Sequence, residues 1–297
     1  MLSRIVPNPI LSWMKTKIQN AVAQGGPLSP KMLTVEAIKY FPYKKSDDSF
    51  VIPKAPAVKY ETCSQGLPIP PQELWSGYGE TAEEYLSSGR EHVQTMLSIL
   101  HSSNFTLSKG NRILDFGCAA GRMMRELKDL SSLCEIWGTD INAEHIYWCK
   151  QHLSPPFHFV TTTTIPHLPF EDSYFDLVYA GSVFTHIDDL AEAWLLELRR
   201  ILSQGGRLYI TIHDNNTVQL LDGKYKTNWL AIKMNNTPSY TQSKHSHSML
   251  VINRDTGSQV FYDIGYFLKT LEPMFDILSV NQEAYGFQTA LLLKKKT

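Results

Sequence analysis

A short glycine-containing turn is the strongest chemical signal in the sequence. The apolar run Arg112-Ile-Leu-Asp-Phe is followed by Gly117-Cys-Ala-Ala-Gly121 and then by a helical pattern. Small residues let the backbone approach a ligand closely, and the N-terminus of the next helix offers N–H groups without intrahelical partners. A phosphate loop would place Lys and Ser or Thr after its last glycine, but Arg122 and Met123 stand there. The third glycine of the dinucleotide fingerprint is also missing, so pyrophosphate binding is disfavoured.

Two acidic residues accompany this turn. Asp115 lies just before it, and Asp140 ends the next predicted strand. An acid at the end of the second strand of a nucleotide-binding unit accepts hydrogen bonds from ribose hydroxyls, whereas an acid directly before the turn suits an amine or a cation. Taken alone, Asp140 could equally be an acid favoured by a helix N-terminus. Together, the two acids and the turn predict a nucleoside that carries an amino acid.

Candidate acid–base residues follow the fourth and fifth predicted strands. His186 comes six residues after the fourth strand, and His213 with Asp214 comes directly after the fifth. A histidine at this edge of a parallel sheet could act as a general base, because its ordinary pKa lies near neutrality. Structural roles are the alternative: His186 could support its loop, and Asp214 could supply turn chemistry instead of orienting His213.

Residues 213–258 are rich in Asn, Thr, Ser and His and show no clear periodicity. Such a stretch between a strand and the next helix predicts a lid-like insertion over the site where a second ligand, the acceptor of a transferred group, would bind. It contains Tyr240, His245 and His247, but a further ligand at suitable spacing is missing. We therefore predict no metal site.

The elements that position these residues alternate between strands and helices from residue 80 onward. This alternation predicts βαβ units and a parallel sheet, with ligands bound at the carboxyl ends of the strands. The expected strands are 112–116, 135–140, 157–161, 174–180, 206–212, 274–281 and 286–294. The expected helices are 81–88, 91–100, 121–130, 143–153, 189–202 and 263–272.

The N-terminal part of the chain differs in kind. It is rich in proline, and its first 70 residues carry nine Lys and Arg against four Asp and Glu. An amphipathic helix is expected at 10–23, either lying on the main domain or contacting a membrane surface or partner. Trp75 and Tyr78 either pack the extension against the domain or close over a ligand. We therefore divide the chain into an extension or cap, 1–79, and a domain, 80–297.

Taken in order, the motifs resemble those of class I S-adenosylmethionine-dependent methyltransferases of the broad type 11 group. Ile113-Leu-Asp-Phe-Gly-Cys-Ala-Ala-Gly resembles the first motif, Gly138-Thr-Asp-Ile the second, Leu168 to Ala180 the fourth-strand motif, and Leu198 to Ile212 the helix and fifth strand. The resemblance covers roughly residues 110–297 and is specific for the cofactor class but not for the substrate. Ala119 departs from the glycine usual in the family, and Thr164 from an acid found in many members.

The resemblance implies an α/β fold. It is a Rossmann-like, doubly wound sheet of seven strands, mostly parallel with an antiparallel last strand, preceded by the N-terminal extension. It also implies S-adenosylmethionine as cofactor and methyl transfer to a small-molecule acceptor, mainly by positioning, with His186 or His213 as candidate base. The implied cofactor residues are Asp115 at the amino group; Gly117, Ala119 and Gly121 along the methionine; Asp140 at the ribose; Ile141, Thr163, Thr164 and Ile165 at the adenine; and Ala180 and Ser182 at the methyl donor.

Composition limits the other classes of function. Of the 297 residues 43% are hydrophobic, so the chain can form a full core, and the net charge of −1 argues against a dedicated nucleic-acid binder. We expect no DNA partner, and RNA or a membrane surface is disfavoured. Four cysteines without a paired motif, and no apolar run long enough to span a bilayer, lead us to expect a cytoplasmic protein. Two alternatives stay open: a cofactor-binding assembly protein without catalysis, and an NAD(P)-dependent oxidoreductase.

Overall fold

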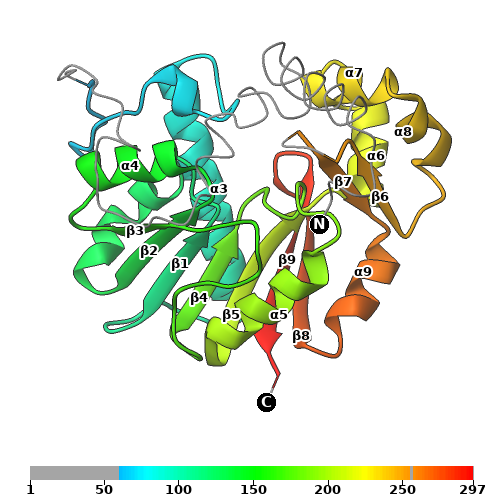
Figure 1. The fold of residues 1–297 in the computed structure, drawn as a ribbon. Coiled ribbons are helices and arrows are strands. Elements are labelled where there is room, and N and C mark those ends of the chain that lie inside the picture. Colours follow the sequence, from blue (N-terminus) through cyan, green and yellow to red (C-terminus); the bar gives the residue numbers. More distant parts are fainter. Residues whose placement is uncertain (1–59, 255–256, 297) are drawn as a thin grey trace, which may run out of the picture.

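The computed structural model describes residues 60–254 and 257–296, and a seven-stranded sheet forms its centre (Figure 1). The strand order is β3-β2-β1-β4-β5-β9-β8. Strands β1 to β5 are parallel, and β9 runs antiparallel to both of its neighbours. The strands are β1 (Arg112–Phe116), β2 (Glu135–Asp140), β3 (His158–Thr161), β4 (Phe175–Ala180), β5 (Leu202–Ile212), β8 (Phe275–Tyr285) and β9 (Gln288–Lys295). The predicted α/β fold with an antiparallel last strand is confirmed.

The helices precede the sheet or connect its strands, and several differ from the sequence prediction. They are η3 (Gln72–Leu74), α3 (Ala82–Ser102), η4 (Met124–Ser132), α4 (Ala143–His152), α5 (Ala191–Ile201), α6 (Asn215–Asp222), α7 (Trp229–Asn235), α8 (Pro238–Ser243) and α9 (Ile264–Leu271). The two predicted helices 81–88 and 91–100 are one helix, α3. Gly89 lies inside this helix. A Cβ at that position would lie 2.6 Å from the Arg122 carbonyl oxygen, so the glycine lets the helix pack closely against Arg122. The helix predicted at 121–130 is a 3₁₀ helix, η4.

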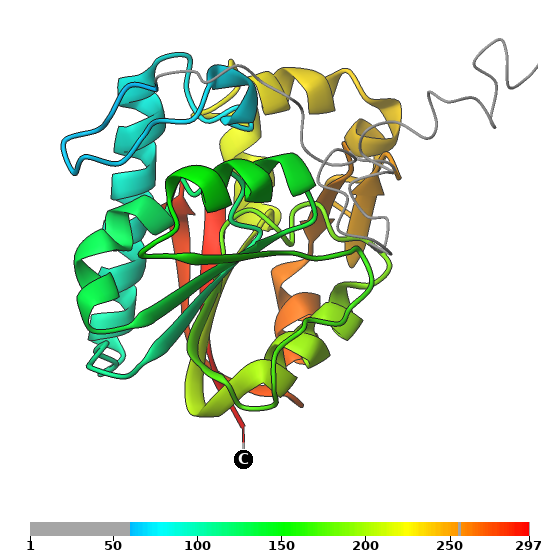
Figure 2. The ribbon, with the colours of Figure 1, turned by 60° about the vertical axis from the view of Figure 1, so that its left-hand side comes forward.

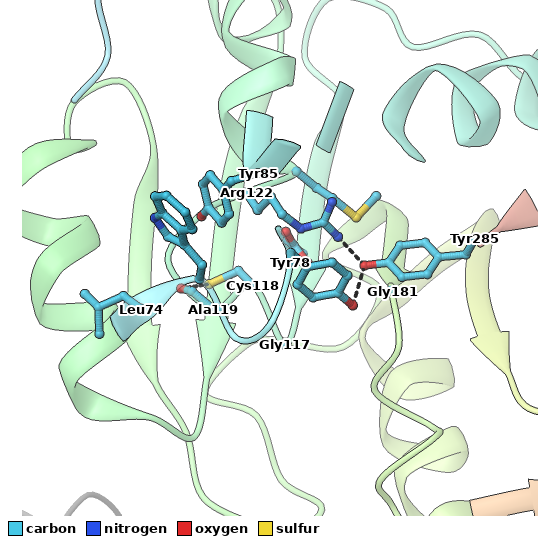
Figure 3. A pocket seen from close by; sticks show the side chains of 12 residues that line it. Leu74, Tyr78, Tyr85, Gly117, Cys118, Ala119, Arg122, Gly181 and Tyr285 are labelled. Carbon is cyan, nitrogen blue, oxygen red and sulfur yellow. Dashed lines mark hydrogen bonds between the residues drawn. The ribbon is translucent and has the colours of Figure 1, made fainter. Parts of the chain in front are cut away.

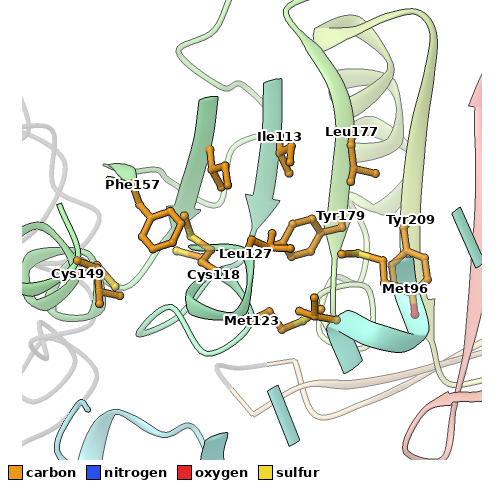
Figure 4. Packing of buried hydrophobic residues seen from close by; sticks show 14 of the residues in the cluster. Met96, Ile113, Cys118, Met123, Leu127, Cys149, Phe157, Leu177, Tyr179 and Tyr209 are labelled. Atoms are coloured by element: carbon orange, nitrogen blue, oxygen red, sulfur yellow. The ribbon is translucent and has the colours of Figure 1, made fainter. Parts of the chain in front are cut away.

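Side chains alternate between the two faces of the sheet and bury a core on each. Ile113 of β1 packs in the cluster formed with α3, η4 and α4, whereas its neighbour Leu114 packs in the cluster formed with α5 and α9. Figure 4 shows part of the first cluster, with Tyr179 and Leu177 of β4 beside Met96 of α3. Figure 2 shows the helices on both sides of the twisted sheet. These two layers fix the positions of the strand ends.

The segment 213–258 is more regular than its composition predicts. It contains α6, α7, α8 and β6 (Met249–Ile252), which pairs with β7 (Gln259–Tyr262). Together with Phe261 of β7, buried Val218, Leu230 and Tyr240 form a small separate core. Helices of six to eight residues leave too short a hydrophobic pattern to recognise in the sequence.

Residues 60–80, here called the strap, pack against α3 and η4. The Trp75 indole donates a hydrogen bond to the Pro70 carbonyl oxygen (2.7 Å) and its ring stacks on Tyr85 of α3 at 5.3 Å. The Arg125 guanidinium donates to the Pro68 carbonyl oxygen at 3.0 Å. The predicted helix at 10–23 lies outside the described residues. No helix within the described parts of the chain is long and apolar enough to span a membrane.

Candidate cofactor and acceptor site

A cleft of about 640 Å³ lies at the carboxyl ends of the central strands. Its walls come from the turn after β1, the end of β2, the loops after β3 and β4, helix α7, the β8–β9 hairpin and the strap. Figure 1 shows the strap (blue) and helices α6 to α8 (yellow) above opposite ends of the sheet. A smaller pocket of about 40 Å³ adjoins the cleft, and Tyr78, Gly117 and Tyr285 line both. The volume of the larger cleft is in the range of cavities that bind cofactors and small ligands.

The turn after β1 follows an unusual backbone path that brings it close to its surroundings. Gly117 has φ +85° and Gly121 has φ +75°, and Ala119 reaches +46° although it carries a side chain. A Cβ on Gly117 would lie 2.4 Å from the Val183 side chain, and a Cβ on Gly121 would lie 2.6 Å from Leu153. Gly117 and Ala119 line the cleft, whereas Gly121 lies away from it and lets the turn pack on α4.

Asp140 joins the end of β2 to this turn. One carboxylate oxygen accepts a hydrogen bond from the Ala119 N–H (2.8 Å), and the other accepts from the Asn142 N–H (2.7 Å). The carboxylate lines the cleft, and its remaining lone pairs can accept hydrogen bonds from a ligand. Thr139 and Thr162 line the same region, and their hydroxyl oxygens are buried without a hydrogen-bond partner among the described residues. This end of the cleft therefore offers polar groups to a hydroxylated ligand.

The neighbouring residues divide into lining and non-lining positions. Ile141, Thr163 and Thr164 line the cleft beside Asp140, and Ile141 is 36% exposed. Ile165 is 67% exposed and does not line it. The loop after β3 thus presents two hydroxyls to the cleft.

Asp115 lies at the inner end, in the smaller pocket. It is 3% exposed, and burial raises its pKa to about 8; the Tyr179 hydroxyl and the Arg122 guanidinium act in the opposite direction, and Asp140 adds to the rise. A cation placed beside this carboxyl would favour its ionised form. The position therefore suits an ammonium group.

Arg122 is a buried cation beside the same pocket (Figure 3). Its guanidinium lies 3.7 Å from the centre of the Tyr78 ring, donates hydrogen bonds to the Tyr285 and Ser88 hydroxyls, and lies 3.1 Å from His92 Nδ1. None of these partners is an anion, and Arg122 forms no ion pair within the described residues. Asp115 acts on Arg122 from the same pocket, but its raised pKa favours the neutral carboxyl, so the pocket suits an anionic group beside Arg122. Asp115 and Arg122 together match the two charges of an amino acid.

His186 lines the outer part of the cleft with a defined tautomer. Its Nδ1 lies 2.7 Å from the Ser258 carbonyl oxygen. Because a carbonyl oxygen only accepts, Nδ1 carries the proton and Nε2 keeps its lone pair. His186 is exposed to the cleft, and partial desolvation by the surrounding protein lowers its pKa; the charge of Lys233 acts in the same direction, and the bond to Ser258 opposes both. The imidazole is therefore neutral and able to accept a proton.

The Asp214 carboxylate is directed to helix α6 and forms no hydrogen bond with His213 in the described part of the chain. Asp214 caps α6, since its carboxylate accepts from the Thr217 N–H at 3.0 Å. His213 is 2% exposed at the cleft wall, and burial lowers its pKa to about 3. Turn chemistry therefore explains Asp214.

Ser182 lies at the cleft in a left-handed conformation, φ +60°. Its N–H donates to the Thr211 hydroxyl (2.7 Å), and its own hydroxyl accepts from Gln288 Nε2 (2.8 Å). Ala180, two residues earlier, is fully buried in the core and does not line the cleft. The network holds the loop after β4 in its strained shape.

Several lining residues were not candidates from the sequence. Arg122 followed the recognised turn directly, but we used it only to exclude a phosphate loop. Trp229, Gln259 and Gln288 lie in distant segments that meet only in the fold. Tyr285 carried no signal beyond its place in the last strand pair. The described residues hold no group of three or more His, Cys, Asp or Glu that could bind a metal ion.

Comparison with known proteins gives the class. Residues 114–210 match the family described as "Methyltransferase domain". Together with the fold and the order of the motifs, this match identifies residues 114–210 as part of a class I S-adenosylmethionine-dependent methyltransferase domain, with S-adenosylmethionine as its cofactor.

Individual relatives are more distant. The chain is 34% identical over 105 residues to sterol 24-C-methyltransferase erg6 of Schizosaccharomyces pombe, which is 34% of this chain and 27% of that protein. It is 26% identical over 138 residues to the ubiquinone/menaquinone biosynthesis C-methyltransferase UbiE of Cupriavidus pinatubonensis, 44% of this chain and 54% of that one. The chain thus spans about a quarter to a half of these relatives. The PH0226 protein of Pyrococcus horikoshii shares the fold with a TM-score of 0.53 and 18% identity, over 74% of this chain and 95% of that one.

Proposed function

We propose that this protein transfers a methyl group from S-adenosylmethionine to a small-molecule acceptor. One observation carries the proposal. A single cleft runs from the ribose-type acid Asp140, past the turn after β1, to a pocket that holds a buried carboxyl and a buried guanidinium. That order of groups matches a nucleoside joined to an amino acid. The division into an extension, 1–79, and a methyltransferase domain, 80–297, with insertion 213–258 belongs to the same proposal.

The cofactor would lie along this cleft. Asp140 would accept the ribose hydroxyls, and Ile141 with Thr163 and Thr164 would contact the adenine. Asp115 would hold the ammonium group and Arg122 the carboxylate. Tyr78 and Tyr285, whose hydroxyls lie 2.9 Å apart, would close over the methionine part.

When bound, the cofactor supplies a methyl carbon on a sulfonium sulfur, and the sulfur keeps the electron pair of the broken C–S bond. Most of the acceleration then comes from positioning the acceptor atom in line with that bond. For a hydroxyl acceptor, His186 Nε2 would take the proton as the oxygen forms its bond to the methyl carbon. His213, with a pKa of about 3, is a poor proton acceptor and would instead contact the acceptor by hydrogen bonding.

Calorimetry with S-adenosylhomocysteine and with NAD tests the cofactor assignment. We expect the former to bind and NAD not to bind. Asp140→Ala should weaken binding by about 1–3 kcal/mol, because a charge-assisted hydrogen bond is lost. Asp129→Ala removes an exposed acid remote from the cleft and serves as the control, with thermal unfolding to show that each variant is folded. Unchanged binding in folded Asp140→Ala would contradict the ribose role.

A further inference from the structure

We propose that the acceptor is a neutral aromatic hydroxyl compound, a phenol, and that phosphorylated or carboxylated compounds are excluded. The proposal rests on the proposed function and concerns one part of the cleft, the acceptor arm, bounded by His186, His213, Trp229, Gln259, Phe287 and Gln288. These residues come from the loop after β4, the end of β5, α7, β7 and the β8–β9 hairpin. Distant segments thus meet at one end of the cleft.

The described residues of the acceptor arm include no cationic side chain that could pair with an anionic ligand. Among the described residues that line the cleft there is no Lys and no Arg. Lys233 is exposed and acts on His186 only through its charge. Arg254 pairs with Asp189 and lies 3.8 Å from Asp188, the carboxylate at the cleft wall. A phosphate or carboxylate in this arm would lose its hydration without gaining a cationic partner.

The polar groups of the arm are neutral and buried. Gln288 is 5% exposed; its carbonyl oxygen accepts from the Thr211 hydroxyl (2.7 Å), and one amide N–H is used by Ser182. The second N–H of the Gln288 amide can therefore donate to a ligand. His213 Nδ1 has no hydrogen-bond partner among the described residues. Gln259, 4% exposed, adds a second amide. Such groups recognise an uncharged oxygen, because a neutral amide or imidazole forms a hydrogen bond with it and requires no opposite charge on the ligand.

Aromatic side chains form the remaining walls. The Phe287 ring lies 5.7 Å from the His213 ring, and Trp229 of α7 is 60% exposed where it borders the cleft. Flat aromatic surfaces favour a flat aromatic guest through stacked and edge-to-face contacts. A phenol meets both conditions, because it offers a ring to these walls and one hydroxyl to the neutral polar groups. In the reaction its oxygen would bond to the methyl carbon while its proton passes to His186 Nε2.

Binding of matched probes tests this class. The full-length protein, saturated with S-adenosylhomocysteine, is titrated with naphthol, hydroxynaphthoate, naphthyl phosphate and methyl glucoside. We expect naphthol to bind at least about tenfold more tightly than either anion or the sugar. Equal or tighter binding of an anion or of the sugar would overturn the proposal, as would absence of naphthol binding to the saturated protein. Failure to bind S-adenosylhomocysteine would instead overturn the proposed function.

A pair of exposed residues on α7 locates the site. Trp229→Ala should weaken naphthol binding by about three- to tenfold, because the stacking surface is lost, and should leave S-adenosylhomocysteine affinity unchanged. Ile232→Ala is the matched control, since Ile232 is 53% exposed on the same helix but does not line the cleft. Equal effects of the two substitutions would contradict the acceptor arm.

Discussion

Charged and neutral residues lie at opposite ends of the site. The inner end has a buried carboxyl and a buried guanidinium, Asp115 and Arg122, and the outer end has neutral imidazoles and amides. Position in the sequence could identify Asp115, because it lies just before a recognisable turn. It could not identify the environment of Arg122, whose partners His92 and Tyr285 are 30 and 163 residues away. Only folding brings these groups together.

The histidine that we assign as base gives a pH-dependent prediction. Partial desolvation lowers the pKa of His186, so the active neutral form persists as pH falls below 6.5 and is lost only when pH passes the lowered pKa. With a phenol acceptor, kcat should therefore rise with pH and reach a plateau below the ordinary histidine range. His186→Asn should lower kcat by about 10²–10⁴ and abolish that inflection, with cofactor affinity retained.

Initial rates from pH 4.5 to about 9 measure both effects. His101→Ala, an exposed histidine on α3 remote from the cleft, is the control and should retain the wild-type profile. A loss of less than about tenfold in kcat for His186→Asn would mean that positioning alone drives the reaction.

At the level of elements, strands were easier to predict than the connections between them. The apolar runs of β1, β2 and β4 were predicted to within one residue, because buried parallel strands are continuous in hydrophobicity. The single helix α3 was predicted as two, 81–88 and 91–100, and Gly89 between them packs against Arg122 without interrupting the helix. The short helices of 213–258 were missed, because each buries only a few side chains against Phe261 of β7.

Helix α6 tests the assignment of Asp214 as a cap. Asp214→Ala should lower the free energy of unfolding by about 1 kcal/mol, within the range for lost N-caps, and Asp214→Asn should retain most of it. Asn228→Ala removes the cap of α7 and should cost a similar amount. Urea unfolding gives these values. A large fall in kcat for Asp214→Asn at unchanged stability would instead favour an orienting role beside His213.

In the whole molecule, the sheet determines where a ligand binds and the surrounding segments determine which ligand. Ends of β1, β2, β4 and β5 meet at one edge, as parallel strands must, so the site could be located from the order of strands. The strap and α7 close opposite ends of the cleft, but their contacts with it depend on packing across the molecule. The sequence could therefore predict the class of cofactor but not the class of acceptor.

An experimental structure of the full-length protein with S-adenosylhomocysteine tests the central claim most directly. We predict the ribose hydroxyls on the Asp140 carboxylate, the amino group at Asp115 and the carboxylate at Arg122 beside Tyr78. The sulfur should face the acceptor arm, with His186 across from it. A ligand in the reverse direction, with adenine against Arg122, or a ligand bound outside this cleft would contradict the account.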